Sequence, residues 1–192
     1  MTEEIEAKVR VASPEAVRRR VAALGAEARG PVLEVNRLFD DAEGSLRAGG
    51  AALRLREERR PRDGAVVRTT LTWKGPQRPG ELKRRVETET TVGEAGPVGA
   101  ILAALGFRET FRYEKRRTAW DVGVCEVVLD EVPHLGWFVE VEGPDEASVR
   151  RTVADLGLAD EPTIAESYVH LLAAYLEAAH LDAGRATFGG GA

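Results

Sequence analysis

The sequence predicts an α+β protein in which antiparallel strands form the main framework and a few helices pack outside them. Two observations support this prediction. Seven or eight segments alternate charged and apolar residues with a period of two, which is typical of strands with one face in an apolar core. Among these segments, three short stretches carry helix start signals and end in the same Leu-Gly pair.

The helical stretches are bounded by residues that favour helix ends. In the first stretch, Ser13 can cap the N-terminus, Pro14 suits the first helical position and Gly25 follows the last turn. The next two stretches repeat this pattern with Pro or Asp at the start and Gly at the end. A fourth stretch, near the C-terminus, has an apolar stripe at helical spacing. The predicted helices lie within residues 13–26, 97–107, 144–158 and 163–181.

The strand-like segments place their charges on one face. Near the N-terminus, EIEAKVRV alternates charged with apolar residues, and side chains two residues apart in a strand point to the same side. The same alternation recurs along the chain, so the segments present rows of acids and bases. The acids are Glu4, Glu6, Glu87, Glu89, Glu126, Asp130, Glu140 and Glu142, and the bases are Lys8, Arg10, Arg54, Arg56, Lys74, Arg85, Lys115 and Arg117.

The composition excludes several classes of protein. The chain has 192 residues, 27 Lys plus Arg, 32 Asp plus Glu and a formal net charge of -5. One cysteine, Cys125, excludes an internal disulfide and a cysteine-rich metal site. No apolar run approaches the roughly 20 residues of a membrane helix, the acidic balance gives no overall attraction to nucleic acid, and no secretion signal is evident. We therefore expect a cytoplasmic protein with a single domain at 1–183 and a flexible tail at 184–192.

The rows of charge allow two interpretations. In an open sheet with one wet face they only keep the protein in solution, and each cross-strand pair contributes roughly 0.2–1 kcal/mol. A solvent face normally also contains Ser, Thr and Gln, whereas these rows are almost entirely ionic. If the sheet closes with the rows inward, the charges need water, metal and a polyanion to offset them. A triphosphate meets this need, because Arg and Lys can bind its oxygens while a divalent metal binds the carboxylates.

Several segments together resemble the CYTH superfamily, the triphosphate tunnel metalloenzymes, which includes class IV adenylate cyclases of the CyaB type and thiamine triphosphatases. EIEAK is similar to the Glu-x-Glu-x-Lys signature of this superfamily. The resemblance continues, in family order, through LFDDAEGSLRAGGAALRLR, LTWKGP, RVETE, EKRRTAW, LDEVPHLGWFVEVEG and ESYVHLL, so it spans residue 4 to about residue 172. It implies a closed eight-stranded antiparallel β-barrel, the tunnel, with helices packed outside. One departure is Asp41, where family members commonly have Thr after Phe-Asp.

The resemblance also implies a role for each matching residue. The implied ligands of Mg²⁺ or Mn²⁺ are Glu4, Glu6, Asp130, Glu140 and Glu142. The implied substrate-binding residues are Lys8, Arg54, Arg56, Lys74, Arg85, Lys115 and Arg117. The implied catalytic residues are Lys8, Lys74, Glu87 and Glu89, with Arg85, Glu87 and Glu89 completing the tunnel wall.

Two reactions fit such a site. In a cyclase the ribose 3′ oxygen of ATP attacks the α-phosphorus and pyrophosphate leaves, whereas in a hydrolase water attacks the terminal phosphorus. The compact length and the Lys-Gly-Pro of WKGP favour a class IV adenylate cyclase-like enzyme. The alternatives are a hydrolase of thiamine triphosphate or inorganic tripolyphosphate, and a non-catalytic module that binds nucleotides or polyphosphate. A homodimer, and a lid formed by a polar loop at 57–70, are further hypotheses.

Overall fold

The computed structural model describes residues 2–80 and 82–189, with side chains from Ile5 onward. The strands are β1 (Thr2–Val11), β2 (Ala28–Asp40), β3 (Ala52–Arg59), β4 (Val66–Lys74), β5 (Lys83–Thr91), β6 (Arg108–Val122), β7 (Cys125–Val132), β8 (Gly136–Gly143) and β9 (Arg185–Ala186). The helices are α1 (Pro14–Ala23), α2 (Ser45–Ala48), α3 (Ala95–Ala104), α4 (Glu146–Asp155) and α5 (Tyr168–Ala178).

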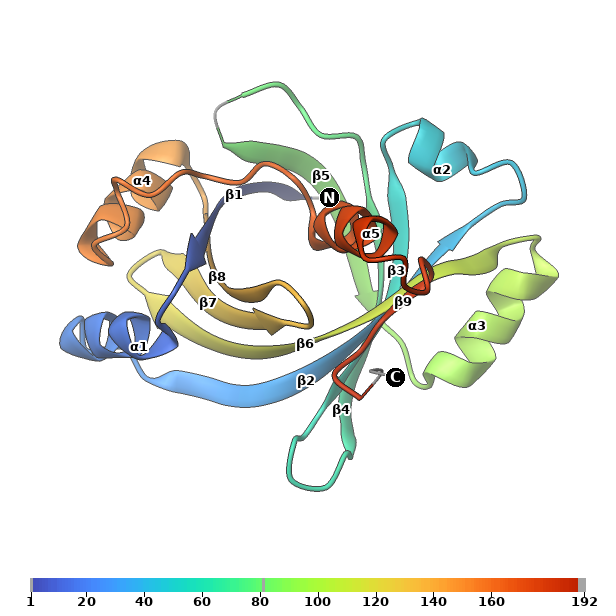
Figure 1. Ribbon diagram of the computed structural model, residues 1–192, viewed down its shortest axis with the longest axis horizontal. Coiled ribbons are helices and arrows are strands. Elements are labelled where there is room, and N and C mark those ends of the chain that lie inside the picture. Colours follow the sequence, from blue (N-terminus) through green and yellow to red (C-terminus); the bar gives the residue numbers. More distant parts are fainter. Residues whose placement is uncertain (1, 81, 190–192) are drawn as a thin grey trace.

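Eight antiparallel strands close into a barrel (Figure 1). Around the barrel the strands follow the order β2, β3, β4, β5, β1, β8, β7 and β6, and β6 then pairs with β2 to complete the ring. Closure leaves none of these eight strands with an open edge, which removes the hazard of edge-to-edge association. The structure therefore confirms the predicted closed eight-stranded barrel.

The two faces of the barrel wall differ in character. On β1, Ile5 and Ala7 point outward into an apolar core that α1 and α4 cover, while Glu6 and Lys8 point into the lumen. The same alternation runs along the neighbouring strand β8, where Lys8 lies in register with Glu140. The period of two therefore sends apolar side chains toward the helices and charged ones into the barrel.

Two further apolar clusters position the remaining long helices. Phe39 and Leu55 pack with Leu102 of α3 on the outside of the barrel. Tyr168, Leu172 and Leu176 of α5 pack instead with apolar residues at the ends of β6, β7 and β8, namely Phe111, Tyr113, Val132 and Phe138. Tyr113 shares the inward face of β6 with the predicted site residues Lys115 and Arg117, so α5 lies against one end of the lumen.

The helices begin and end close to the predicted bounds, with two differences. Ser13 and Asp145 cap α1 and α4 as expected, but α3 starts at Ala95 instead of Pro97. The predicted helix 163–181 is shortened to α5, because the preceding residues pair with β1: the backbone N–H of Ile164 donates to the Lys8 carbonyl oxygen at 2.8 Å. The short helix α2 was not predicted. Two carboxylates, Asp40 and Asp41, stabilise its first turn.

Two carboxylates hold the single turn of α2 in place. The Asp40 side chain accepts hydrogen bonds from the backbone N–H groups of Leu46 and Arg47, and Asp41 accepts one from Ser45. These bonds satisfy donors that the first turn of a helix leaves without partners. The hydrogen bond from the backbone N–H of Ser45 also lowers the pKa of the Asp41 carboxyl. The departure Asp41 therefore has a structural role at this turn.

The segment 57–70 is mostly strand and not a loop. β3 continues to Arg59 and β4 begins at Val66, and the cross-strand pairs include Glu57 with Thr69. Only residues 60–65 form the turn, at the tip of a hairpin that projects from the barrel (Figure 1). The polar loop expected at 57–70 is therefore confined to this turn, because ladder hydrogen bonds join both arms.

The C-terminal end also differs from the prediction of a flexible tail from residue 184. The short strand β9 pairs in parallel with β6, and Ala186 is buried. The backbone N–H of Phe188 then donates to Glu114 Oε2 at 3.0 Å. The glycine-rich composition gives no sign of these contacts, which form only when β6 is in place. Residues 190–192 lie outside the described part of the chain.

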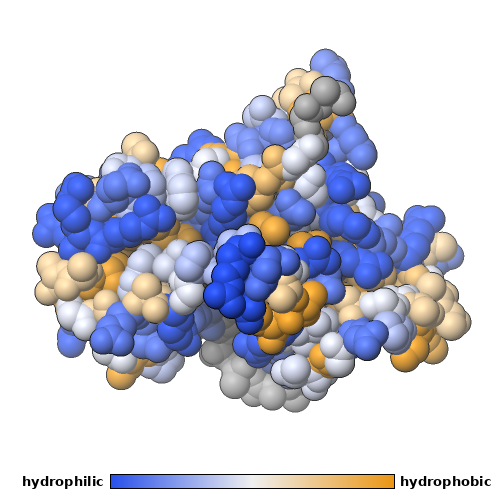
Figure 2. All heavy atoms as spheres, turned by 90° about the horizontal axis from the view of Figure 1, so that it is seen from below, coloured by the Kyte–Doolittle hydropathy of each residue, from blue (hydrophilic) through white to orange (hydrophobic). Residues whose placement is uncertain are grey.

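The face seen in Figure 2 is mainly hydrophilic, with small apolar patches between the charged groups. Among the described residues, the helices are all too short or too polar to span a membrane.

Candidate active site

A cavity of about 1430 Å³ occupies the barrel lumen and is lined by side chains from all eight barrel strands. Every residue of the predicted substrate-binding set lies in its wall: Lys8, Arg54, Arg56, Lys74, Arg85, Lys115 and Arg117. The predicted residues Glu6, Glu87, Glu89, Glu140 and Glu142 lie there too, as does Lys83. Glu4 is paired with Arg85 through the β1–β5 backbone register, but its side chain lies outside the described set.

Acidic side chains face the lumen from β1 and β8. Glu6 is buried, and its Oε2 accepts a hydrogen bond from Lys83 Nζ at 2.6 Å. Lys8 Nζ lies 3.6 Å from Glu6 Oε1 and 3.4 Å from Glu140 Oε1. Burial raises the pKa of Glu140, but Lys8, Lys115 and Arg117 outweigh burial and hold that pKa well below its usual value. The carboxylate of Glu140 is therefore ionised at neutral pH.

Asp130 is fully buried and is surrounded by donors. Arg117 binds both of its oxygens, with Nε 2.8 Å from Oδ1 and Nη2 2.6 Å from Oδ2. Lys115 Nζ and the Tyr168 hydroxyl also donate to Oδ2, at 3.0 and 3.1 Å. Asp130 has little free coordination capacity for a metal, because each oxygen already accepts a charge-assisted hydrogen bond. The contacts give it a second function, to hold Arg117 and Lys115 in the lumen wall.

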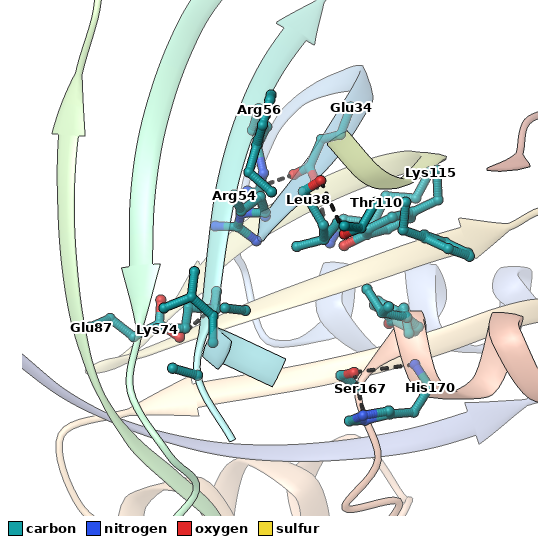
Figure 3. Close-up of a pocket in the computed structure, with 18 of the residues that line it drawn as sticks. Glu34, Leu38, Arg54, Arg56, Lys74, Glu87, Thr110, Lys115, Ser167 and His170 are labelled. Carbon is teal, nitrogen blue, oxygen red and sulfur yellow. Dashed lines mark hydrogen bonds and ion pairs between the residues drawn. The ribbon is translucent and has the colours of Figure 1, made fainter. Parts of the chain in front are cut away.

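Glu34 of β2 is a buried carboxylate that the sequence analysis missed. Its Oε1 lies 3.0 Å from Arg56 Nη1 and 3.5 Å from Arg117 Nε, and its Oε2 lies 3.4 Å from Lys115 Nζ. Figure 3 shows Arg56 and Glu34 joined across the lumen wall, with Arg54 and Lys115 nearby. Burial raises the pKa of Glu34, but the surrounding cations, Arg56 first, lower it far more. Glu34 is therefore ionised in the folded protein.

The signal for Glu34 was present in the sequence. Glu34 and Asn36 alternate with Leu33 and Val35, the same period-two pattern that identified the other lumen residues. Asn36 also faces the cavity side of β2, where its Oδ1 accepts a hydrogen bond from Arg56 Nε at 3.0 Å. Glu34 was not predicted because its strand contributes one acid and one amide instead of a pair of charges.

The wall formed by β4 and β5 combines charged and hydroxyl side chains. Lys74 forms an ion pair with Glu87 (Figure 3). Thr72 Oγ1 donates to Glu89 Oε2 at 2.8 Å and accepts from Arg54 Nη2 at 3.3 Å. Thr72 was not predicted, since Thr is common in strands of any function.

Tyr168 is another site residue that was not assigned a role from the sequence. Its ring lies 4.3 Å from Lys8 Nζ and 5.2 Å from Lys115 Nζ, measured to the ring centroid, so the aromatic face contacts two ammonium groups. Lys8 Nζ also donates to the Glu166 carbonyl oxygen at 2.9 Å. Burial, with the nearby Asp130 and Glu140 carboxylates, raises the pKa of Tyr168 well above its usual value. The phenol thus remains a hydrogen-bond donor at any physiological pH.

Three buried polar atoms in the cavity wall have no hydrogen-bond partner in the described structure: Arg54 Nε, Arg85 Nε and Glu6 Oε1. Buried polar groups are nearly always satisfied, so each such atom needs an explanation. The two donors suit an anionic ligand, and the acceptor suits a cation bound to that ligand.

The carboxylates also bear on metal binding. Among the side chains that the structure describes, residues 5–80 and 82–189, no three of His, Cys, Asp or Glu converge closely enough to form a metal site by themselves. Glu6 Oε1 is nevertheless a buried acceptor with spare capacity, and Glu6 lies in register with Glu142 of β8. Mg²⁺ commonly uses one or two carboxylates and completes its shell with water and substrate phosphate. The donor set therefore fits a metal that arrives with an anionic substrate.

The cavity extends beyond the ionic lumen toward α2 and α5. There its wall contains uncharged side chains, including Leu38, Leu46, Phe111, Val169 and Ala173. Ser167 and His170 lie at this end and contact each other at 3.1 Å (Figure 3). The site therefore consists of a charged tunnel followed by a mouth in which apolar side chains lie among charged ones, including Asp40, Arg47, Arg108 and Glu177.

Comparisons with known proteins agree with this geometry. The model of the CYTH domain matches residues 2–168. A protein of Methanocaldococcus jannaschii named "Putative adenylate cyclase MJ0240" is 28% identical over 139 residues, which cover 72% of this chain and 75% of that protein.

Solved structures share the fold. The PH1819 protein of Pyrococcus horikoshii OT3 superposes with a TM-score of 0.76 at 24% identity, over 90% of this chain and 99% of that one. The Hippeastrum protein HpAC1, described as a "putative adenylyl cyclase" with a dominant triphosphatase activity, has a TM-score of 0.67 at 18% identity, over 95% of this chain and 97% of its own. Since the family match spans far more than half of the sequence, the chain belongs to the CYTH domain family.

Proposed function

We propose that this protein is a metal-dependent enzyme that holds the phosphate chain of a nucleoside triphosphate in the barrel lumen, with class IV adenylate cyclase-like activity on ATP. The observation that carries the proposal is the set of buried atoms in the cavity wall that have no hydrogen-bond partner among the described residues: Arg54 Nε and Arg85 Nε as donors, and Glu6 Oε1 as an acceptor. Lys8 Nζ, 3.6 Å from Glu6 Oε1, gives that oxygen an ion pair only. A triphosphate with a bound divalent cation supplies partners for all three. CYTH relatives named for adenylate cyclase support the same assignment.

The lumen cations would bind and orient the phosphates. Arg54, Arg56, Lys74, Lys115 and Arg117 face the cavity from three different strands, so an extended chain of oxygens can meet a donor on several sides. Phosphoryl chemistry depends mainly on positioning and on neutralising charge, which fixed guanidinium and ammonium groups provide. Lys74 and Lys8 are the proposed catalytic cations, and Glu87 and Glu89 on β5, between β4 and β1, are proposed to act with them.

Glu6, Glu140 and Glu142 would hold Mg²⁺ or Mn²⁺, with Glu4 as a further proposed ligand. When bound, the metal would offset phosphate charge and polarise the phosphoryl oxygens. We propose that Asp130 acts mainly on Arg117 and Lys115, because its oxygens accept bonds from both. This refines its prediction as a metal ligand.

The apolar side chains at the mouth favour a nucleotide over bare tripolyphosphate. At about 1430 Å³ the cavity exceeds the roughly 300–1,000 Å³ typical of small-molecule sites. Uncharged side chains such as Leu46 and Val169 offer a surface for a base and a sugar. In the cyclase reaction the ribose 3′ oxygen forms a bond to the α-phosphorus, the bond from that phosphorus to the bridging oxygen breaks, and pyrophosphate leaves.

Hydrolysis of a triphosphate is the second candidate. It requires the same cations and carboxylates with water as the nucleophile, and a water-accessible cavity lies beside them. The dominant triphosphatase activity described for HpAC1, on the same fold, is the reason to test it directly. Thiamine triphosphate and inorganic tripolyphosphate are the alternative substrates.

Product analysis tests the proposal. The purified protein is incubated with Mg²⁺ or Mn²⁺ and, in parallel, with ATP, thiamine triphosphate and inorganic tripolyphosphate. We expect cyclic AMP and pyrophosphate from ATP. Orthophosphate without cyclic AMP would assign the enzyme as a hydrolase, and tight binding without metal-dependent turnover would identify a non-catalytic binding module.

A further inference from the structure

Glu34 is a negative charge placed where an anionic substrate would have to bind. Its side chain is 1% exposed, and three of the proposed phosphate-binding cations surround it: Arg56 at 3.0 Å, Lys115 at 3.4 Å and Arg117 at 3.5 Å. No role assigned to the site so far uses this carboxylate. Burying a charge is costly unless it is paired, so its position among these cations requires a reason.

We propose that Glu34 is a positioning residue that gathers Arg56, Lys115 and Arg117 in the empty tunnel and, by remaining there, weakens the binding of the phosphate chain enough to let products leave. This inference rests on the proposed function, and it adds a residue that controls substrate and product affinity.

The first half of the inference follows from repulsion among like charges. Arg54, Arg56, Lys115 and Arg117 crowd one part of the lumen, and Arg56 lowers the pKa of Arg54 in addition to the effect of burial. Without an anion between them, these side chains would move apart or draw in water. Asp130 holds Lys115 and Arg117 from the β7 side. Glu34 is the described carboxylate within 4 Å of Arg56, so it joins the β3 cation to the β6 pair.

The second half follows from the fixed position of the carboxylate. Asn36 Nδ2 lies 3.4 Å from Glu34 Oε2, and Asn36 in turn accepts a bond from Arg56 Nε, so the amide ties Glu34 to the strand face. A phosphate that binds to Arg56 or Arg117 therefore shares each cation with Glu34 and lies near a like charge. Coulomb repulsion at such distances is large enough to change affinity by about tenfold or more.

The test compares three variants by calorimetric titration with inorganic tripolyphosphate, in EDTA and separately with Mg²⁺. Glu34→Gln keeps the shape of the side chain and removes its charge, so we expect tripolyphosphate to bind about tenfold more tightly. Asn36→Asp adds a charge beside Glu34, so we expect binding to weaken by a similar factor. Glu131→Gln, which removes an acid paired with Arg116 on the outer face of β7, is the matched control and should leave affinity unchanged.

A purely structural role for Glu34 predicts a different result. Loss of structure would lower the melting temperature of Glu34→Gln and would weaken tripolyphosphate binding or leave it unchanged. The proposal predicts a lower melting temperature without ligand, tighter binding, and a larger rise in melting temperature when tripolyphosphate is added.

The outcomes separate the two proposals. If the wild-type protein binds no tripolyphosphate with or without Mg²⁺, the proposed function fails and this inference with it. If the wild type binds but a folded Glu34→Gln variant binds no more tightly, only the role of Glu34 is overturned. If Glu34→Gln does not fold, the tripolyphosphate affinity of Asn36→Asp is the test. Weaker binding by that variant supports the role of Glu34, and unchanged or tighter binding overturns it.

Discussion

Both faces of the barrel wall are buried, the outer face among apolar side chains and the inner face among charged ones. On β7 and β8, Leu129, Val139 and Val141 point outward, are at most 1% exposed and belong to the apolar core under α1 and α4. On the inner face of the same strands, Asp130 and Glu140 are held by charged partners at 2.6–3.4 Å. Adjacent residues of one strand thus lie in very different surroundings.

The comparison shows which face stabilises the fold. Burial of apolar surface contributes roughly 25 cal/mol per Å². Removing paired charges from water costs about as much as their attraction returns, and apolar replacements of such pairs are often more stable. The outer face therefore contributes most of the stability of the barrel. The ionic face has to be explained by binding.

The largest effect should come from the inner face. If Glu6 is a metal ligand, Glu6→Gln should lower metal-dependent turnover by about 100-fold or more, the loss typical of removing one electrostatic contact to a reacting group. Steady-state rates with ATP at several Mg²⁺ concentrations measure it. The amide can still accept from Lys83, which bonds to Glu6 Oε2, so the protein should remain folded. Glu131→Gln on the outer face is the control, and equal activity in the two variants would contradict the metal assignment.

The reciprocal change on the outer face should affect stability instead. Leu129→Ala removes a fully buried side chain from the apolar core and should lower the free energy of unfolding by about 2–5 kcal/mol. Urea denaturation measures this loss. Turnover per folded molecule should remain within about twofold of wild type at a temperature where the variant is native. A large loss of activity in the folded variant would show that the two faces are coupled.

The pH dependence of stability should also separate the faces. The pKa values of Glu34 and Glu140 lie below the ordinary 4.5, so in the unfolded chain these groups take up protons at a higher pH than in the native protein. Their contribution to stability is complete above about pH 4.5 and is lost as the pH falls further toward the native pKa values.

Urea denaturation between pH 3 and pH 7 measures this effect. The free energy of unfolding should be nearly constant at the upper end and should fall below about pH 4.5. Glu140→Gln should flatten the fall, whereas Leu129→Ala should lower the whole curve without changing its slope. An unchanged slope in Glu140→Gln would mean that the inner carboxylates do not control the acid transition.

The smallest expected effect concerns two helix caps. Ser167 and Ser13 each accept a hydrogen bond at 3.3 Å from a backbone N–H in the first turn of their helix, so replacement by Ala should cost about 1 kcal/mol in either case. Ser167→Ala should in addition change the KM for the triphosphate by a few-fold, because α5 carries Tyr168 against Asp130. Ser13→Ala in α1 is the matched control. Equal KM values in the two variants would show that the cap of α5 does not affect substrate binding in the lumen.

Much of the site could be predicted because alternation in a strand is a local property. Glu6, Lys8, Arg54, Arg56, Lys74, Lys115 and Arg117 were all predicted and all face one cavity. Glu34 and Thr72 share that cavity side but were missed, since a single acid or a Thr in a strand is not distinctive. Tyr168 could not be assigned from its helix, because its role depends on where α5 packs.

The amino-acid sequence by itself determined most of the strands, the two kinds of face and the starts of α1 and α4, because these depend on neighbours within a few residues. Only the tertiary structure decided which charges meet. Arg56, Glu34 and Lys115 lie on β3, β2 and β6, and they form one cluster because β2 pairs with both of the other strands as the barrel closes. Register between distant strands sets those distances, and no local pattern encodes it. The register of the β6–β7 hairpin likewise places Asp130 opposite Arg117, so that Arg117 and Lys115 both donate to its carboxylate.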